Sequence, residues 1–510
     1  MASITMISME ALAEIVSGRK AFVRTHSGEV RPGDVFVALP KAVPVAPSGP
    51  DYSVAAQYLA AAVKAGASYA VCPQFVYDAA RAVISETIVT QNLAICIAED
   101  TRMALGLLAR AWYGTEKSGV RLVGITGTNG KTTSTYLLEQ IFKAAGHSSG
   151  VIGTVEYRWP GYEEASPLTT PDCMRLHGMV AAMAGAGADT AFMEVSSHAI
   201  EQNRIAGLDF TAALFTNLTQ DHLDYHKNME DYYGVKKRLF LDPANGGTQL
   251  EGKNLAVNVD DPYGERLFAG CPSALGYGFG SSARKYAMRC LMGELLEQSQ
   301  DGLRLAMQYK GNTWELRSPL VGAFNASNLL GAQALALACG IAQEHMQSLA
   351  LFGGVPGRLE RIVNPHGFAV FVDYAHTPDA LRKALQALRE AHFRRVITVF
   401  GCGGNRDRTK RPLMGQAAAE LSDIVVVTSD NPRHEEPLAI MADIKPGLAA
   451  AHKVIEEVDR KKAIGLALDA LGEGDALLVA GKGHEPYQII GDTKYPFSDQ
   501  QIVRALLGCA

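Results

Sequence analysis

A glycine-rich segment near residue 127 carries the strongest chemical signal in the sequence. It reads Gly124-Ile-Thr-Gly127-Thr-Asn-Gly130-Lys131-Thr132-Thr133, and it overlaps the end of an apolar run that begins at Val120. Backbone N–H groups of such a loop and of the helix after it can surround phosphate oxygens, and the helix dipole favours their charge. Lys131 would add positive charge at the β- and γ-phosphates, and Thr132 a hydroxyl for Mg²⁺. The alternative is an ordinary Gly-rich turn, but the Lys-Thr ending favours a phosphate loop.

The loop is a variant, because Ile125 stands where the generic pattern has Gly. Its form, Thr-Gly-Thr-Asn-Gly-Lys-Thr, resembles the Mur ligase family of peptidoglycan synthesis. The resemblance implies an ATP-dependent ligase that activates a carboxylate as an acyl phosphate and joins it to an amine. Further matching segments follow in order: Met193 to His198, Thr216 to His226, Met229 to Lys236, Asn258 to Asp261, Gly322 to Asn328, Gly357 to Glu360, Asp373 to Ala380, Gly401 to Asp407, Asp430 to Arg433 and Gly481 to Glu485.

The segment Asp430-Asn431-Pro432-Arg433 narrows the resemblance within the family. It is similar to the form in members that add meso-diaminopimelate to UDP-N-acetylmuramoyl-L-alanyl-D-glutamate, whereas lysine-adding members lack it. A guanidinium can hold the distal carboxylate of diaminopimelate, which lysine does not have. Three alternatives stay open: a lysine-adding ligase, a folylpolyglutamate synthase, and a phosphate-loop NTPase switch or motor without ligase activity. A folylpolyglutamate synthase would not be expected to combine this segment with Thr169-Thr170-Pro171.

The resemblance implies which residues bind ATP and which bind metal ions, and they come from both halves of the chain. Two Mg²⁺ ions are expected, with Thr132, Glu194, His222 and Lys236 as ligands; Lys131, Glu194, His222 and Lys236 would serve catalysis. A surface charge or helix cap is the alternative for Glu194, and a helix cap the alternative for Asn328. The expected ATP-binding residues are Gly127, Thr128, Asn129, Gly130, Lys131, Thr132, Thr133, Asn325, Asn328, Arg358 and Asp373.

Lys236 is a special case, because the family has a carbamylated lysine at the matching position. A carbamate turns a cation into an anion with two oxygens that can hold a metal ion. Taken alone, Lys236 would be a solvated helix lysine, but the Met-x-x-Tyr-x-x-x-Lys spacing from Met229 favours the carbamate. The adjacent Lys237 is the competing residue.

The resemblance also implies contacts to both substrates. Ser27 matches the uracil-binding turn, although Gly28 stands where the family has Arg and the 40–50 loop departs from the usual form. Leu168 stands where some members have Asn before the two threonines. The expected muramyl-peptide contacts are Thr169, Thr170, Ser196, Gln202 and Arg204, and the expected diaminopimelate contacts are Arg406, Asp430, Asn431, Pro432, Arg433, Gly481 and Glu485.

These residues require a scaffold of alternating strands and helices, and the pattern supplies one. We expect an α/β protein of three domains: a small N-terminal α/β domain (1–103), a central phosphate-loop domain with a mostly parallel sheet (104–350), and a C-terminal Rossmann-like domain (351–510). Polar, strand-like sequence at 305–316 interrupts the alternation, and Gly353-Gly-Val-Pro-Gly357 marks the last boundary.

Composition fits a soluble globular protein and argues against several other classes. Among 510 residues, 47% are hydrophobic and the net charge is −5, so bulk electrostatics give no sign of a nucleic-acid partner. The eight cysteines show no Cys-x-x-Cys spacing, which argues against a thiolate zinc site or a disulfide scaffold. No signal peptide and no run of 18 apolar residues is expected. We therefore expect a cytoplasmic monomer.

Overall fold

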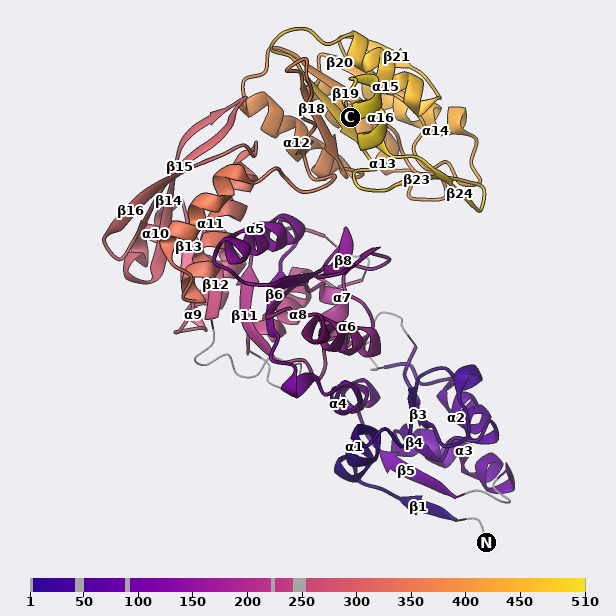
Figure 1. Ribbon diagram of the computed structural model, residues 1–510. Coiled ribbons are helices and arrows are strands. Elements are labelled where there is room, and N and C mark those ends of the chain that lie inside the picture. Colours follow the sequence, from indigo (N-terminus) through magenta and orange to yellow (C-terminus); the bar gives the residue numbers. More distant parts are fainter. Residues whose placement is uncertain (1–2, 42–49, 88–91, 222–224, 242–253, 510) are drawn as a thin grey trace. The chain divides into compact units, whose positions relative to one another are not determined.

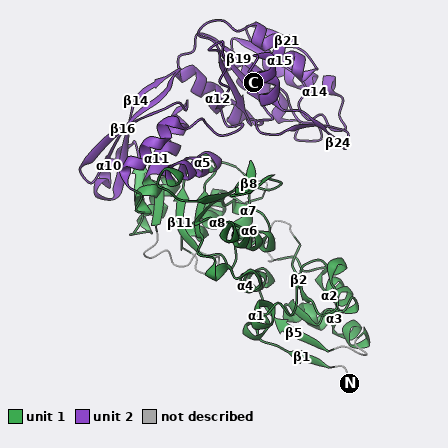
Figure 2. Ribbon diagram, viewed as in Figure 1, with its two compact units in different colours: residues 1–131, 142–277, 334–341 green, residues 132–141, 278–333, 342–510 purple. Residues whose placement is uncertain are grey.

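The computed structural model describes residues 3–41, 50–87, 92–221, 225–241 and 254–509. The chain divides into two compact units (Figure 2): Met1–Lys131, Phe142–Tyr277 and Ala334–Ile341 form the first, and Thr132–Ile141, Gly278–Gln333 and Ala342–Ala510 the second. The division passes through two helices, α5 (Lys131–Ala144) and α11 (Ala323–Ala338). The domain limits given above, 1–103, 104–350 and 351–510, stay a prediction.

The first unit begins with a small parallel sheet (Figure 1). Its strand order is β1 (Ile4–Met6), β5 (Leu93–Ile97), β4 (Tyr69–Cys72), β3 (Val35–Val37) and β2 (Val23–Arg24). Alternate residues enter two separate cores, with Phe36 and Ala70 on one face and Val35 and Val71 on the other. Such two-sided burial is what a parallel sheet covered by helices requires. The helices are α1 (Met9–Ser17), α2 (Ala55–Lys64), α3 (Gln74–Thr87) and α4 (Thr101–Tyr113).

A larger sheet in the same unit carries the phosphate loop. Its order is β13 (Leu275–Gly278), β12 (Asn254–Asn258), β11 (Phe210–Phe215), β6 (Arg121–Thr126), β10 (Thr190–Glu194), β7 (Ser149–Ile152), β8 (Glu156–Trp159) and β9 (Tyr162–Ala165). Pairing is parallel from β13 to β7 and antiparallel from β7 to β9. Its helices include α6 (Cys173–Gly185), α7 (Ser197–Glu201), α8 (Met229–Leu241) and α9 (Pro262–Ala269).

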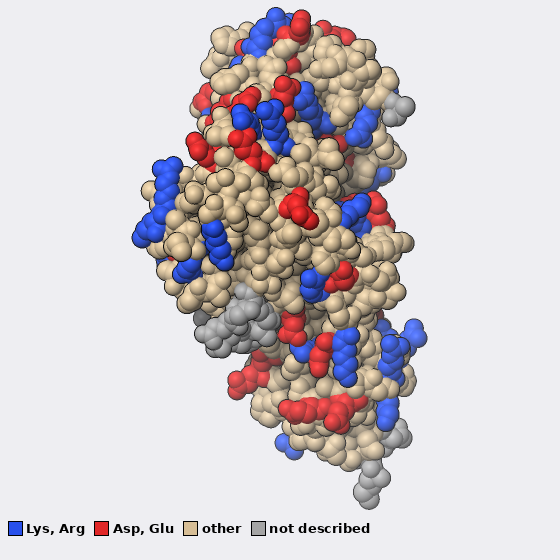
Figure 3. Space-filling view, turned by 60° about the vertical axis from the view of Figure 1, so that its left-hand side comes forward, with Lys and Arg blue, Asp and Glu red and all other residues tan. Residues whose placement is uncertain are grey.

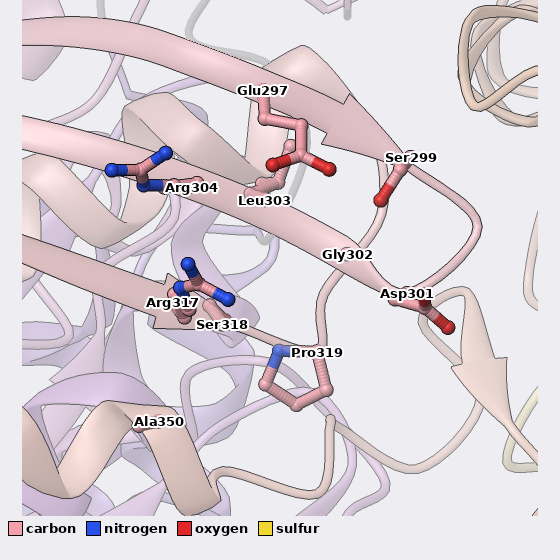
Figure 4. Close-up of a pocket in the computed structure, with 10 residues that line it drawn as sticks. All are labelled: Glu297, Ser299, Asp301, Gly302, Leu303, Arg304, Arg317, Ser318, Pro319 and Ala350. Atoms are coloured by element: carbon pink, nitrogen blue, oxygen red, sulfur yellow. The ribbon is translucent and has the colours of Figure 1, made fainter.

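In the second unit, the polar stretch at 305–316 is resolved into strands of an antiparallel meander. The strands are β14 (Cys290–Ser299), β15 (Gly302–Tyr309) and β16 (Asn312–Ser318), preceded by helix α10 (Ser281–Lys285). Lys310 and Gly311 turn the chain with positive φ angles, which splits the expected stretch in two. A pocket of about 240 Å³ at the ends of these strands contains Arg304 and Arg317 (Figure 4), and none of the predicted site residues lines it.

The remainder of the second unit is a Rossmann-like layer, as predicted. The sheet order is β17 (Glu360–Arg361), β18 (Ala369–Asp373), β22 (Ala476–Ala480), β19 (Val396–Phe400), β20 (Ile424–Val427) and β21 (Val454–Glu456). All pairs are parallel except β17 with β18. A small hairpin, β23 (Tyr487–Ile490) with β24 (Thr493–Pro496), follows. The helices are α12 (Pro378–Glu390), α13 (Lys410–Leu421), α14 (Pro437–Ile444), α15 (Arg460–Asp469) and α16 (Asp499–Leu506).

The expected α/β class with mostly parallel sheets is therefore confirmed. Acidic and basic side chains are interspersed on the face shown in Figure 3. In the part of the chain that the structure describes, no helix has both the length and the apolar composition that crossing a membrane requires.

Candidate active site

The phosphate loop joins the end of β6 to the start of α5, as the sequence predicts. Gly127 has φ +146° and Gly130 has φ +84°, conformations that glycine adopts at little cost. A side chain at Gly127 would meet a second obstacle, because its Cβ would lie 1.9 Å from Thr216 Oγ1. The loop therefore needs glycine at this position for its conformation and for its close approach to β11.

Residues just after β11 hold this loop in place. The Thr128 N–H donates to Asn217 O (2.9 Å), and the Asn129 N–H donates to Asn217 Oδ1 (3.0 Å). In return, Thr216 Oγ1 donates to Asn129 O at 2.6 Å. The Thr216-Asn217 pair and the Gly-rich loop thus form one hydrogen-bonded structure, although they are about 90 positions apart in the chain.

Two lysines converge on the start of the loop. Lys131 Nζ donates to Gly127 O (3.0 Å) and Thr128 O (2.9 Å), and Lys236 Nζ donates to Gly127 O (2.9 Å). The side chain of Lys236 is 1% exposed. Burial lowers the pKa of Lys236 well below its usual value; the nearby Lys131 charge lowers it further, and Asp221 acts in the opposite direction. A buried lysine with a lowered pKa is an amine that can be neutral and nucleophilic at neutral pH.

Aromatic rings pack around the Lys236 ammonium group. It lies 4.8 Å from the centre of the Tyr232 ring, which in turn stacks on His226 at 4.8 Å. His226 Nε2 lies 2.9 Å from Ser197 Oγ, which links the segment before α8 to the start of α7. His222, predicted as a metal ligand, lies outside the described residues.

Glu194 ends strand β10 and is almost completely buried, with 1% exposure. Its two carboxylate oxygens accept from the backbone N–H and the hydroxyl of Thr154, at 2.8 and 3.0 Å. Gly153 leaves room for the carboxylate, because a Cβ there would lie 2.5 Å from Glu194 Oε1. The surface-charge alternative for Glu194 is excluded by its burial, and the helix-cap alternative by its place in a strand; its carboxylate is fixed from one side by neighbouring donors.

The predicted muramyl-peptide residues form one network beside Glu194. Thr170 Oγ1 donates to Glu194 O (2.8 Å) and accepts from the Ser196 N–H (3.1 Å). Arg204 Nη1 donates to Thr170 O (2.9 Å), and its Nε and Nη2 donate to Gln202 Oε1. Burial lowers the pKa of Arg204. The structure therefore brings together Thr169, Thr170, Ser196, Gln202 and Arg204, as the resemblance implied.

In the second unit, Asn325 and Asn328 lie in the first turns of α11 and are buried. Asn325 Nδ2 donates to Val321 O (2.8 Å), and Asn328 Nδ2 donates to Asn325 Oδ1 (3.1 Å). The two amides order the start of the helix. Asn328 therefore has a structural role of the kind that the helix-cap alternative describes.

Arg358 and Asp373 lie together at the start of the C-terminal sheet. The Arg358 guanidinium lies 5.1 Å from the centre of the Tyr374 ring, and its buried Nε has no hydrogen-bond partner in the described structure. Asp373 accepts from the N–H groups of Leu359 and Ala375, while its burial raises its pKa and Arg358 opposes that shift. A buried N–H without an acceptor is costly, so Arg358 is suited to an acceptor that a ligand brings.

The predicted diaminopimelate residues come from three loops that meet at the carboxyl ends of β19, β20 and β22. Asn431 Nδ2 donates to Glu485 Oε2 at 2.9 Å. A Cβ on Gly481 would lie 2.5 Å from Asp430 Oδ2, and one on Gly404 would lie 1.8 Å from Pro432 O. These loops therefore pack so closely that glycine is required where they touch. The carboxyl edge of a parallel sheet is the usual ligand site in such folds.

The two predicted arginines flank Gly403. A Cβ there would lie 3.1 Å from Arg433 Nη1 and 3.7 Å from Arg406 Cγ. Arg433 has φ +53°, and its Nη1 donates to Gly404 O at 3.0 Å. Arg406 is exposed. The left-handed backbone at Arg433 is unusual for a residue with a side chain and concentrates at functional sites.

Sequence reasoning missed two residues in these clusters. Lys482 is completely buried and donates to Asn431 Oδ1 (3.0 Å), with Glu485 Oε2 at 3.4 Å. It lies inside the Gly481–Glu485 segment, so its position could have revealed it. Thr154 follows β7 and carried no motif signal.

Ser27 is half-buried in a short turn of the N-terminal sheet domain, and the 42–49 loop expected near it lies outside the described residues.

Comparison with known proteins adds independent evidence. Residues 125–336 match the Mur ligase middle domain, and residues 357–483 match the Mur ligase glutamate ligase domain. A UDP-N-acetylmuramoyl-L-alanyl-D-glutamate–2,6-diaminopimelate ligase from Lawsonia intracellularis is 48% identical over 98% of this chain and 99% of its own. The enzyme of that name from Synechococcus elongatus is 42% identical over 95% and 93%. A solved structure with that name has TM-score 0.66 and 30% identity, and covers 96% and 94% of the two chains.

Proposed function

The chain belongs to the Mur ligase family, and we propose that it is the ATP-dependent member that joins meso-diaminopimelate to UDP-N-acetylmuramoyl-L-alanyl-D-glutamate in peptidoglycan precursor synthesis. The observation that carries this proposal is the cluster of Asp430, Asn431, Arg433 and Glu485. Its side chains and backbone meet at one edge of the C-terminal sheet. Both positive and negative groups are present there, as an amino acid with a second ammonium–carboxylate head would require.

The reaction begins with transfer of the γ-phosphoryl group of ATP to the D-glutamate γ-carboxylate. The amine of diaminopimelate then attacks the acyl phosphate, and the resulting tetrahedral intermediate collapses to an amide and phosphate. Bringing ATP and a carboxylate together opposes like charges, so positive groups must surround the phosphates. Gly127 to Thr133 form the phosphate loop, and Lys131 within it supplies a positive charge. Arg358, with its unpartnered buried Nε, and Asp373, Asn325 and Asn328 are proposed to bind the nucleotide.

Mg²⁺ is proposed to bind Glu194, Thr132, His222 and the carbamate of Lys236, in two sites. Bound Mg²⁺ would offset phosphate charge. The chemistry of the described donors fits, because the buried Glu194 carboxylate and the Thr132 hydroxyl are hard oxygen ligands of the kind that this ion prefers. Carbamylation requires a neutral amine, and the lowered pKa of Lys236 supports that requirement. As an ammonium, Lys236 would instead repel a metal ion.

The substrate-binding roles follow from the charges of the ligands. Arg204 and the hydroxyls of Thr169, Thr170 and Ser196 are proposed to bind the muramyl peptide, with Gln202 orienting Arg204. Ser27 is proposed to bind the uracil end. Arg433 and Arg406 are proposed to bind the distal carboxylate of diaminopimelate, while Asp430 and Glu485 face its ammonium group, together with Asn431, Pro432 and Gly481.

A cytoplasmic monomer is the proposed form of the enzyme. The nucleotide-linked substrate and ATP are water-soluble, which supports the location. Light scattering after gel filtration should give a mass near 54.6 kDa.

Phosphate release in the presence of UDP-muramyl dipeptide, diaminopimelate and ATP tests the proposal. Release should require all three, which a phosphate-loop switch or motor would not show. Lys131→Ala should abolish ligation without altering the circular dichroism spectrum. ATP turnover that is independent of both co-substrates, or full ligation by the folded Lys131→Ala variant, would refute the assignment.

A further inference from the structure

The Thr154 hydroxyl lies between the buried carboxylate of Glu194 and the loop that precedes α6. Its Oγ1 is 3.0 Å from Glu194 Oε2 and 3.1 Å from Thr169 Oγ1. The backbone N–H of Thr154 holds the other Glu194 oxygen at 2.8 Å. Thr154 follows β7, which pairs in parallel with β10, the strand that Glu194 ends. One residue therefore contacts a proposed Mg²⁺ ligand and a proposed substrate residue.

The chemistry of these three groups fixes the direction of both hydrogen bonds. A carboxylate can only accept, so the Thr154 hydroxyl must donate its single hydrogen to Glu194. The Thr154 oxygen can then only accept from Thr169, which must donate its own hydrogen. Once that hydrogen is used, the Thr169 oxygen has only lone pairs left for a ligand.

The neighbouring hydroxyl pair is also hydrogen-bonded within the protein. Thr170 Oγ1 donates to the Glu194 backbone carbonyl at 2.8 Å and accepts from the Ser196 N–H at 3.1 Å. Ser196 Oγ accepts from the Ala199 N–H at 3.2 Å as the cap of α7. Thr170 Oγ1 and Ser196 Oγ lie 3.3 Å apart, so a Thr170 hydroxyl that donates to Glu194 can only accept from the Ser196 hydroxyl. Both hydrogens are then used within the protein, and these hydroxyls, like Thr169, have only lone pairs left for a ligand.

We propose that Thr154 is a positioning residue that couples the Glu194 carboxylate to the substrate loop and commits Thr169 to accept a hydrogen bond from an amide N–H of the UDP-muramyl dipeptide. This inference rests on the proposed function, because it takes Thr169 as a substrate contact. It goes further by assigning a role to Thr154 and an acceptor role to the Thr169 hydroxyl.

The first test is calorimetric binding of UDP-muramyl dipeptide without ATP or Mg²⁺. Thr154→Val keeps the shape and removes the hydroxyl, and Thr154→Ser keeps the hydroxyl. Loss of one neutral hydrogen bond should weaken binding by about three- to tenfold in Thr154→Val. Thr154→Ser should stay within about twofold of the wild type. Thr211→Val is the matched control, because the Thr211 hydroxyl donates only to Leu122 O in the same sheet, and it should bind normally.

Turnover gives a second readout that simple loss of packing would not reproduce. Thr154→Val should raise both the KM for UDP-muramyl dipeptide and the Mg²⁺ concentration for half-maximal rate, and leave the KM for diaminopimelate unchanged. Thr154→Ser should restore both values. If Thr154→Val binds and turns over like the wild type, the coupling is refuted while the proposed function stands. If the wild type fails to bind UDP-muramyl dipeptide, the proposed function itself fails.

The direction of the bond at Thr169 is tested with two ester analogues of UDP-muramyl dipeptide, each with one peptide-chain amide N–H replaced by oxygen. The wild type should bind one of them about three- to tenfold more weakly than the parent amide. Thr169→Val should bind that analogue and the amide equally, because it has no acceptor to lose. Equal wild-type binding of both esters and the amide, or an unchanged preference in Thr169→Val, would overturn the assignment of Thr169 as an acceptor.

Discussion

The Lys236 ammonium nitrogen lies 2.9 Å from the carbonyl oxygen of Gly127, the residue that opens the phosphate loop. Lys131 Nζ contacts the same carbonyl at 3.0 Å, so two lysine side chains share one acceptor. Burial and the Lys131 charge together disfavour the charged form of Lys236. Conversion of this amine to a carbamate would remove that repulsion and place an anion beside Lys131.

Lys236→Ala should therefore be nearly inactive in ligation, and short-chain carboxylic acids should partly restore its rate by supplying oxygens to Mg²⁺. Lys237→Ala is the matched control, because its side chain is exposed on the same helix, and it should keep full activity. Initial rates with and without added acetate give the measurement. A high-resolution map with an unmodified ammonium at Lys236, together with full activity in CO₂-free buffer, would contradict the carbamate.

Gly127→Ala should disrupt ATP use, because the new Cβ would lie 1.9 Å from Thr216 Oγ1 in a backbone conformation that disfavours side chains. Strain of this kind costs about 1–3 kcal/mol, so chemical denaturation should detect it. Gly146→Ala separates the two causes, since Gly146 also has a positive φ (+86°) but open space around it. We expect loss of ATP turnover only in Gly127→Ala. Equal losses of ATP turnover in Gly127→Ala and Gly146→Ala would refute the role of the Thr216 contact.

His177 should make the first unit less stable in mild acid. Burial lowers its pKa from 6.5 to about 4, and the ring contacts Thr115 Oγ1 at 2.7 Å and Ala206 O at 3.0 Å. His177 binds a proton below pH 6.5 in the unfolded chain, but only near pH 4 in the folded chain. The free energy of unfolding is therefore unaffected by this group above pH 6.5 and decreases as pH falls from 6.5 toward 4. The loss should approach about 1.4 kcal/mol per pH unit.

His177→Gln keeps a donor for Ala206 but does not titrate, so it isolates this effect. Urea unfolding followed between pH 4.5 and 7 should show a steeper pH dependence in the wild type than in His177→Gln. Parallel curves for the two proteins would show that His177 does not control acid stability.

The order of elements in the chain was predictable because hydrophobic period and length separate strands from helices. The polar, strand-like stretch at 305–316 is an example, although Lys310 and Gly311 divide it between β15 and β16.

Candidate site residues could be proposed from the sequence where the chemistry resides in a local motif, as in the phosphate loop and the Asp430–Arg433 segment. Thr154 was not predictable, because its role depends on the parallel pairing of β7 with β10, which places it beside Glu194 from 40 positions away. Lys482 lies inside a matched segment, but its contact with Asn431, 51 positions away, could not be read from the sequence. Contacts of this kind arise from packing and leave no periodic signal in one sequence.

Lys482→Met should weaken diaminopimelate binding without preventing folding of the C-terminal sheet. Methionine fills a similar volume but removes the donor to Asn431 Oδ1 and the charge beside Glu485. A hydrogen bond from a charged group contributes about 1.5–3 kcal/mol, so the KM for diaminopimelate should rise by about tenfold or more. Lys494→Met, on the nearby hairpin over the Tyr487 ring, should leave KM unchanged. A normal KM in Lys482→Met would exclude Lys482 from this site.

The preference for diaminopimelate over lysine is the central claim, and Arg433 is its expected basis. In Arg433→Ala, loss of a charge-assisted contact should lower kcat/KM for diaminopimelate by at least about tenfold. Lysine should gain little, because Arg433→Ala creates no new contact for it and only removes a charge that its distal ammonium group would avoid. The decisive measurement is kcat/KM for both amino acids in the wild type and in Arg433→Ala. The wild type should strongly prefer diaminopimelate, and Arg433→Ala should reduce that preference. A wild type that prefers lysine, or an unchanged kcat/KM for diaminopimelate in Arg433→Ala, would contradict the proposed specificity.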